Sequence, residues 1–144
     1  MTGVQTCALP ILAALDGGEK AVQVSCGHAA IALALQSYLK AGDHVLMTDS
    51  AYGPTRTMCS RFFDRFGIET TYYDPLIGAG IETLMRPNTR VVYLEIPGTL
   101  TFEMQDVPAI AAAARKRGAK VLLDNTWASG LFFKPFEHGV DLAI

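Results

Sequence analysis

Short apolar runs alternate with helix-like segments along almost the whole chain, and this alternation restricts the fold more than any other feature. We expect strands at residues 20–25, 44–48, 68–73, 89–96, 119–124 and 140–144. Between them, the pattern predicts helices at residues 28–40, 54–66, 81–86 and 107–117. This order predicts an α/β fold, a mostly parallel sheet with helices on both faces.

The expected strands are apolar at nearly every position, which is typical of strands that are buried on both faces. Asp106 precedes the helix expected at 107–117 and is a good N-cap, and Gly118 follows that helix as a stop signal. Ligands of such sheets bind beyond the carboxyl ends of the strands. The loops that follow the strands are therefore the candidate functional segments.

Composition excludes several classes of partner. The chain has 144 residues, of which 50% are hydrophobic and 18% charged, and its net charge is −2. These values indicate one globular domain without the basic surface that nucleic acid requires. No apolar run is long enough to span a bilayer. Cys7, Cys26 and Cys59 show no CxxC spacing, so we expect reduced thiols, no metal site and a cytoplasmic location.

The first residues fit poorly with the rest of the chain. "MTGVQTCALPI" lacks the basic start of a secretion signal and looks like translated sequencing-adapter read-through. We therefore expect residues 1–10 to be a non-native leader and residues 11–144 to form the domain. An ordinary helix that starts near Pro10 is the alternative.

Two of the strand-end loops have features that suit an anionic or flat ligand. In Ser25–His28, Gly27 allows a ligand to approach the backbone, and the following helix presents free N–H groups to an anion. The loop matches neither GxGxxG nor GxxxxGK[ST], and it is equally compatible with a plain turn. In residues 49–55, Tyr52 could cover a flat ligand or could simply pack.

The other two loops follow the strands expected at 89–96 and 119–124. Pro97 and Gly98 are typical of a turn. Asp124 closes an apolar strand, where a buried carboxylate is costly unless a cation or a proton meets it. A helix cap or a salt bridge would also explain Asp124.

Taken together, the loops resemble one family over residues 11–144. The segments that carry the resemblance are "SCGHAAI", "DSAYGPT", "LEIPGTLTFEMQDVPAIAAAA" and "LLDNTWASGLFFKPFEHGVDLAI". They resemble the Cys/Met-metabolism family of pyridoxal-phosphate-dependent enzymes, and within it the bacterial cystathionine β-lyase branch. The resemblance implies the large domain of fold-type I transferases, with pyridoxal 5′-phosphate as cofactor.

The resemblance implies a carbon–sulfur lyase of methionine biosynthesis that converts L-cystathionine to homocysteine, pyruvate and ammonia by β-elimination. The alternatives are a cystathionine γ-lyase, a γ-synthase or another trans-sulfuration enzyme of the same family. A non-catalytic phosphate- or nucleotide-binding α/β domain is an alternative from a different class. It should carry a glycine-rich phosphate fingerprint, which the sequence lacks.

The resemblance also implies roles for individual residues. Asp124 would pair with the protonated pyridine nitrogen, and the Tyr52 ring would stack on the pyridine ring. The backbone N–H groups of Gly27 and His28 would hold the phosphate. The family more often has Ser-Gly-Met or Ser-Gly-Leu in that loop, but a backbone contact tolerates the change to His28.

Thr126 and Thr99 complete the expected cofactor-binding set. Thr126 would lie beside the cofactor ring. Thr99 stands where many members have an asparagine that touches the cofactor hydroxyl and the substrate carboxylate, and a small hydroxyl residue there favours the β-lyase branch. Lys120 and Lys134 do not match the family's Schiff-base lysine, which we expect just after Ile144.

The resemblance further implies a chain that is only part of the enzyme. We expect a fragment of the large domain that is inactive alone. The complete protein would be a cytoplasmic homotetramer, built from dimers that share their sites and acting on a small amino-acid substrate. We expect neither a nucleic acid nor a membrane as partner.

Overall fold

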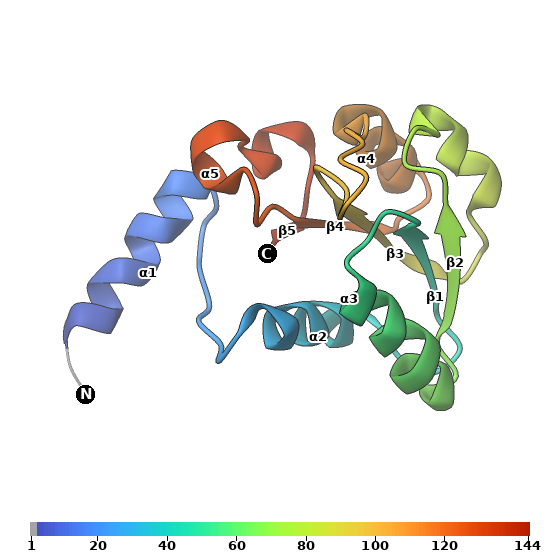
Figure 1. Ribbon diagram of the computed structural model, residues 1–144, viewed down its shortest axis with the longest axis horizontal. Coiled ribbons are helices and arrows are strands. Elements are labelled where there is room, and N and C mark those ends of the chain that lie inside the picture. The colour runs from blue at the N-terminus through green and yellow to red at the C-terminus, as the bar shows by residue number, and fades with distance from the viewer. Residues whose placement is uncertain (1–2) are drawn as a thin grey trace.

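A parallel five-stranded sheet between two helical layers forms the centre of the protein (Figure 1). The computed structural model describes the backbone of residues 3–144 and the side chains from residue 8 onward. The strands are β1 (His44–Thr48), β2 (Glu69–Tyr73), β3 (Thr89–Glu95), β4 (Lys120–Asp124) and β5 (Leu142–Ala143). They lie in the order β2-β1-β3-β4-β5, and every neighbouring pair is parallel. The predicted fold class is confirmed.

One face of the sheet is covered by α4 (Val107–Lys116) and the 3₁₀ segment η3 (Gly78–Leu84). Ile110 of α4 and Ile81 of η3 are fully buried in this layer. The predicted cap is present, because the Asp106 carboxylate accepts a hydrogen bond from the Ala109 N–H at 3.1 Å. The cap satisfies one of the free donors at the start of α4.

The opposite face is covered by α2 (Gly27–Tyr38) and by a continuous helical segment that begins with α3 (Gly53–Met58) (Figure 1). That segment continues as the π-helix η1 (Cys59–Phe63) and the 3₁₀ turn η2 (Asp64–Phe66). It confirms the helix predicted at residues 54–66. Leu35 and Phe63 pack with the sheet in this layer.

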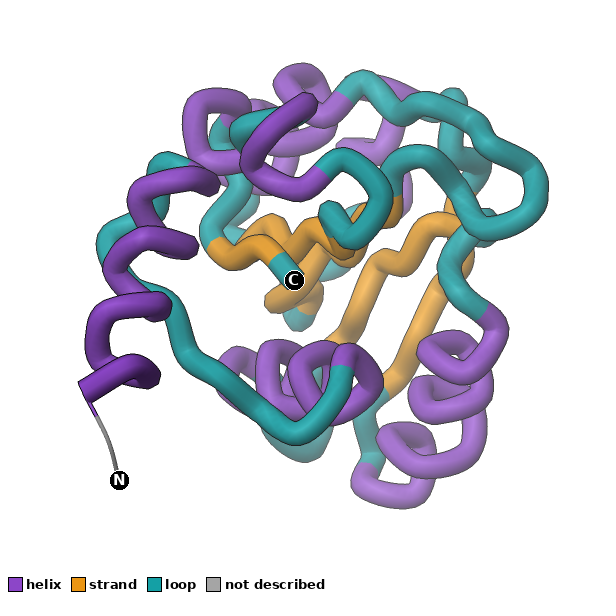
Figure 2. Tube along the Cα trace, turned by 60° about the vertical axis from the view of Figure 1, so that its left-hand side comes forward, coloured by secondary structure: helices purple, strands orange, loops and turns teal. Residues whose placement is uncertain are grey.

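The helix α1 (Gly3–Asp16) stands away from the sheet and meets the short helix α5 (Ser129–Phe132), which η4 (Pro135–His138) follows (Figures 1 and 2). The contact is close, because a Cβ at Gly130 would lie 2.6 Å from the Leu15 carbonyl oxygen. Residues 3–10 belong to α1, and residues 1–2 lie outside the described part. Within residues 3–144, no helix combines the length and apolar character needed to cross a membrane.

The strand predicted at residues 20–25 is wrong. These residues form a loop between α1 and α2, which Figure 2 shows apart from the strands, and Val22 is 78% exposed. A strand needs a neighbour for its backbone N–H and C=O groups, and no described segment pairs with this one. The last predicted strand, 140–144, exists but is reduced to β5.

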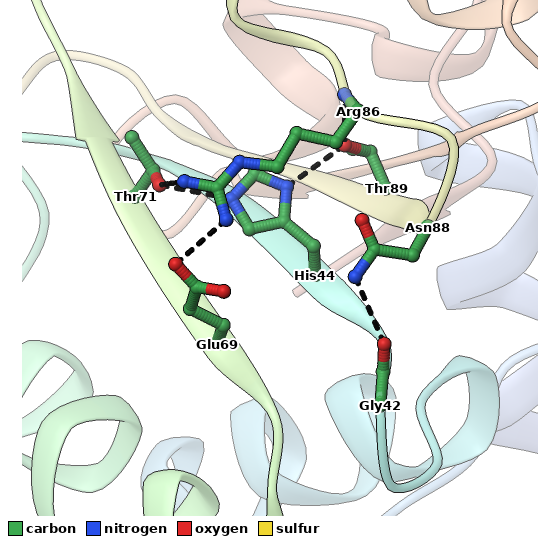
Figure 3. A network of polar contacts seen from close by, with 7 residues as sticks. All are labelled: Gly42, His44, Glu69, Thr71, Arg86, Asn88 and Thr89. Atoms are coloured by element: carbon green, nitrogen blue, oxygen red, sulfur yellow. Dashed lines mark hydrogen bonds and ion pairs between the residues drawn. The ribbon is translucent and has the colours of Figure 1, made fainter.

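A buried histidine joins three strands at the amino end of the sheet (Figure 3). The His44 ring contacts the Thr89 hydroxyl through Nδ1 at 2.8 Å and the Thr71 hydroxyl through Nε2 at 2.9 Å. Arg86 lies beside it and pairs with Glu69 at 2.6 Å. Burial lowers the pKa of His44, and the Arg86 charge lowers it further, although Glu69 opposes this effect. The folded protein therefore favours the neutral ring.

We predict that the free energy of unfolding falls as the pH drops below about 6.5, the ordinary pKa of histidine, because unfolded His44 binds a proton more readily than folded His44. Chemical denaturation at about pH 7.5, 6.5 and 5.5 measures this loss. The loss should be smaller in His44→Gln, whereas His138→Gln is the matched control on η4. Equal pH dependence in wild type and His44→Gln would contradict the prediction.

Candidate functional site

The loops selected from the sequence share one edge of the sheet. Because all strands are parallel, β1, β3 and β4 end side by side, and the β3–β4 register pairs Glu95 with Asp124. Residues 39–43 join the end of α2 to the start of β1, so α2 runs opposite to β1. The start of α2 at Gly27 therefore lies at the end of the sheet where the strands have their carboxyl ends.

The buried Glu95 carboxylate connects the loops that contain Tyr52 and Thr99. Its Oε2 accepts the Tyr52 N–H at 2.8 Å, and its Oε1 pairs with the Thr99 hydroxyl. The Thr99 N–H also donates to the Ser50 carbonyl at 2.8 Å. Hydrogen bonds to Glu95 therefore connect Tyr52 with Thr99. Both were predicted site residues, whereas Glu95 was not.

Electrostatics at Glu95 reflect this position. Burial raises the pKa of Glu95, while the Thr99 hydroxyl and the Tyr52 N–H lower it and the nearby Asp124 charge raises it. The main-chain carbonyl of Glu95 accepts the Gln105 side-chain N–H at 2.9 Å. Both the side chain and the backbone of Glu95 are therefore held in place.

Asp124 lies at the end of β4, and only 8% of the residue is exposed. Its Oδ1 accepts the Thr126 N–H at 3.1 Å, and the Tyr93 hydroxyl lies 3.5 Å from Oδ2. Burial holds the pKa of Tyr93 well above its usual range, and the nearby carboxylates of Asp124 and Glu95 raise this pKa further. Within the described residues, no cationic side chain pairs with Asp124. A buried carboxylate without a cation suits a cationic ligand atom.

Gly27 and His28 are the first residues of α2. The backbone N–H groups in the first turn of a helix have no partner within the helix and point out of its amino end. The N-cap, Cys26, makes no side-chain capping bond, and a Cβ at Gly27 would meet nothing within 4 Å. This end of α2 is open to an anion. No hydrogen bond in the described chain links it to Asp124.

A groove of about 810 Å³ runs between α2 and the segment that begins with α3. His28 lines it together with Gly53, Pro54 and Arg61. It does not include Asp124, so it borders the predicted site without containing it. Thr126 and Tyr52 are exposed at the strand edge, and 47% of Tyr52 is accessible.

The sequence carried a signal for Glu95 that was missed. Glu95 closes the apolar run of β3 as Asp124 closes that of β4, and the same cost of burial applies to both carboxylates. Pro97 and Gly98, which follow Glu95, indicated a turn, and the carboxylate itself was not considered. By contrast, the contact between the loops of Tyr52 and Thr99 depends on strand order, which has no local signal.

Comparisons with known proteins agree on one family. A family model described as Cys/Met metabolism PLP-dependent enzyme matches residues 6–144. Cystathionine beta-lyase MetC of Escherichia coli is 46% identical over 132 residues, which are 90% of this chain and 33% of that protein. Cystathionine beta-lyase of Haemophilus influenzae is 43% identical over 136 residues, 93% of this chain and 34% of that protein.

A solved structure shows the same fold. The cystathionine gamma-lyase from Lactobacillus plantarum complexed with L-serine has a TM-score of 0.89 and 31% sequence identity, over 92% of this chain and 35% of that chain. The chain spans about a third of the length of the curated relatives it matches.

We predict that Gly98→Ala destabilises the protein by about 1–3 kcal/mol, because an added methyl group in a tight contact forces neighbours to shift. A Cβ there would lie 2.6 Å from the Ser50 Cβ and Oγ. Gly53→Ala is the control, since a Cβ at Gly53 meets nothing within 4 Å. Thermal and chemical unfolding of both variants measure the effect. Equal stability of the two variants would show that the loop after β3 can move away from Ser50.

Proposed function

Because this chain belongs to the Cys/Met metabolism family of PLP-dependent enzymes, we propose that it is part of the cofactor-binding domain of a carbon–sulfur lyase. The reaction we propose is β-elimination from L-cystathionine to homocysteine, pyruvate and ammonia. The two relatives named cystathionine beta-lyase support this choice. The structural similarity to a cystathionine gamma-lyase keeps γ-elimination as the second candidate.

The observation that carries the proposal is the buried Asp124 carboxylate without a cationic partner in the described residues, on the side of the sheet where α2 begins. Pyridoxal 5′-phosphate has a ring nitrogen that can carry a proton and a phosphate that carries negative charge. The carboxylate suits the first and the helix start at Gly27 suits the second. The residues present therefore fit the cofactor.

Each predicted residue then has a defined task. Asp124 would hold the proton on the ring nitrogen, and the N–H groups of Gly27 and His28 would bind the phosphate. The exposed Tyr52 ring would cover one face of the pyridine. When bound, pyridoxal 5′-phosphate supplies an electron sink for negative charge at the substrate α-carbon.

Two threonines would complete the site. Thr126 follows Asp124 by two residues and donates its backbone N–H to that carboxylate, which fixes the orientation of the acid. Thr99 lies in the loop beside Tyr52 and would line the cofactor and substrate side.

We also propose that the lysine that carries the cofactor follows Ile144. Lys120 lies at the other end of β4 and pairs with Asp141 at 2.7 Å, and Lys134 precedes η4. The Ile144 carbonyl accepts the Asn125 N–H at 2.8 Å, so the chain leaves the sheet next to Asp124. A lysine placed shortly after Ile144 would therefore reach the site, and residues 1–144 alone would be inactive.

The remaining proposals concern the complete protein. We propose a cytoplasmic homo-oligomer whose subunits share their sites, and a small amino acid as substrate. We also keep the proposal that residues 1–10 are a non-native leader, although the family match begins at residue 6.

We predict that Asp124→Asn in the complete protein leaves the fold nearly intact and lowers turnover of L-cystathionine by orders of magnitude. The two side chains are similar in shape, but an amide cannot keep the ring nitrogen protonated. Asp141→Asn is the matched control, because Asp141 binds Lys120 at the other end of β4. Release of pyruvate measures β-elimination, and release of 2-oxobutyrate would indicate γ-elimination. Near-wild-type turnover in Asp124→Asn would remove Asp124 from the site.

We further predict that the complete coding sequence has a lysine within a few residues of Ile144, in a context similar to Thr-Lys-Tyr. Sequencing of the gene beyond the codon for Ile144 tests this directly. A complete reading frame without a lysine in that segment would contradict the lyase assignment.

A further inference from the structure

Glu95 is a buried titratable group at the strand edge to which the proposed function gives no task. Only 3% of the residue is exposed. Its two carboxylate oxygens contact different loops, since Oε2 accepts the Tyr52 N–H and Oε1 pairs with the Thr99 hydroxyl. Glu95 therefore lies between two residues of the candidate site without being exposed enough to bind a ligand itself.

The two loops have few other connections. The described hydrogen bonds between them are those through Glu95 and the bond from the Thr99 N–H to the Ser50 carbonyl. Loss of the Glu95 side chain would leave the Tyr52 N–H at the start of α3 without this acceptor. Among the described hydrogen bonds, the two loops would then be joined only by the bond from the Thr99 N–H to the Ser50 carbonyl.

We propose that Glu95 is a positioning residue, which joins the Tyr52 and Thr99 loops and orients the Thr99 hydroxyl toward itself. This inference rests on the proposed function of the site. The Thr99 hydroxyl donates to Glu95 Oε1, so it keeps only acceptor lone pairs for a ligand. Thr99 then suits a donor, such as an ammonium or hydroxyl group, and cannot donate to a substrate carboxylate.

The test measures binding without catalysis. Pyridoxine 5′-phosphate is the probe, because an alcohol replaces the aldehyde and no bond to a lysine can form. Trp127 is the single tryptophan of the chain, lies three residues after Asp124 and is 61% exposed, so its fluorescence reports binding at this edge. Free pyridoxine and inorganic phosphate separate the contributions of the ring and of the phosphate.

The variants are Glu95→Ala and Glu95→Gln, with Glu69→Ala and Glu69→Gln as controls. Glu69 is also a strand carboxylate, but it lies at the opposite end of the sheet and pairs with Arg86. In Glu95→Gln, the amide oxygen can accept the Tyr52 N–H and the NH₂ group can donate to the Thr99 oxygen. The glutamine should therefore preserve the connection that alanine removes.

We expect Glu95→Ala to raise the Kd for pyridoxine 5′-phosphate about tenfold, because a hydrogen bond to a charged group contributes roughly this factor. Glu95→Gln should stay within about threefold of wild type, as expected when neutral hydrogen bonds replace charged ones. The amide proton resonance of Tyr52 should move upfield in Glu95→Ala and much less in Glu95→Gln. The Glu69 controls should leave both values unchanged.

Equal Kd values and an unchanged Tyr52 resonance in Glu95→Ala would overturn the inference and leave the proposed function intact. Absence of saturable binding by the unmodified chain would contradict the proposed function, and this role of Glu95 with it. If circular dichroism shows that Glu95→Ala does not fold, Thr99→Val replaces it. That variant replaces the hydroxyl with a methyl group and so removes the Thr99 contact with Glu95, and an unchanged Kd would equally overturn the inference.

Discussion

The parallel pairing of β3 with β4 brings two buried carboxylates to the same edge, and the arrangement of the site depends on how each is stabilised. Burial of an ionised carboxylate is costly unless donors or cations compensate it. Glu95 has a donor on each oxygen, from Tyr52 and from Thr99. Asp124 has one short backbone contact and a phenol at 3.5 Å, so it is the carboxylate that remains for a ligand.

The opposite end of the sheet supports this edge. His44, Thr89 and Thr71 connect β1, β3 and β2 by side-chain contacts in addition to the backbone ladder (Figure 3). Contacts at the amino ends and at the carboxyl ends limit how far neighbouring strands can slide past one another. The loops after the strands are thus carried by a rigid frame, which favours precise placement of Tyr52 and Asp124.

The periodic apolar pattern predicted the sheet well, because strands that are buried on both faces have a strong local signal. It failed at residues 20–25, where valines gave the right composition but the described chain offers no neighbouring strand. The same limit explains Glu95. Its burial could be read from the apolar run that it closes, but its partners, Tyr52 and Thr99, follow from strand order and register.

The ends of α2 and β5 define what this edge can bind. The start of α2 at Gly27 favours negative charge, and the Asp124 carboxylate favours positive charge, so the edge suits a ligand that carries both. Ile144 is tied to Asn125 by a backbone hydrogen bond, so residues that follow β5 would be delivered beside Asp124. A cationic side chain from such residues would enter a place where two carboxylates already lie. Asp124 has no cationic partner among the described residues, so a cationic group of the ligand would compensate this carboxylate.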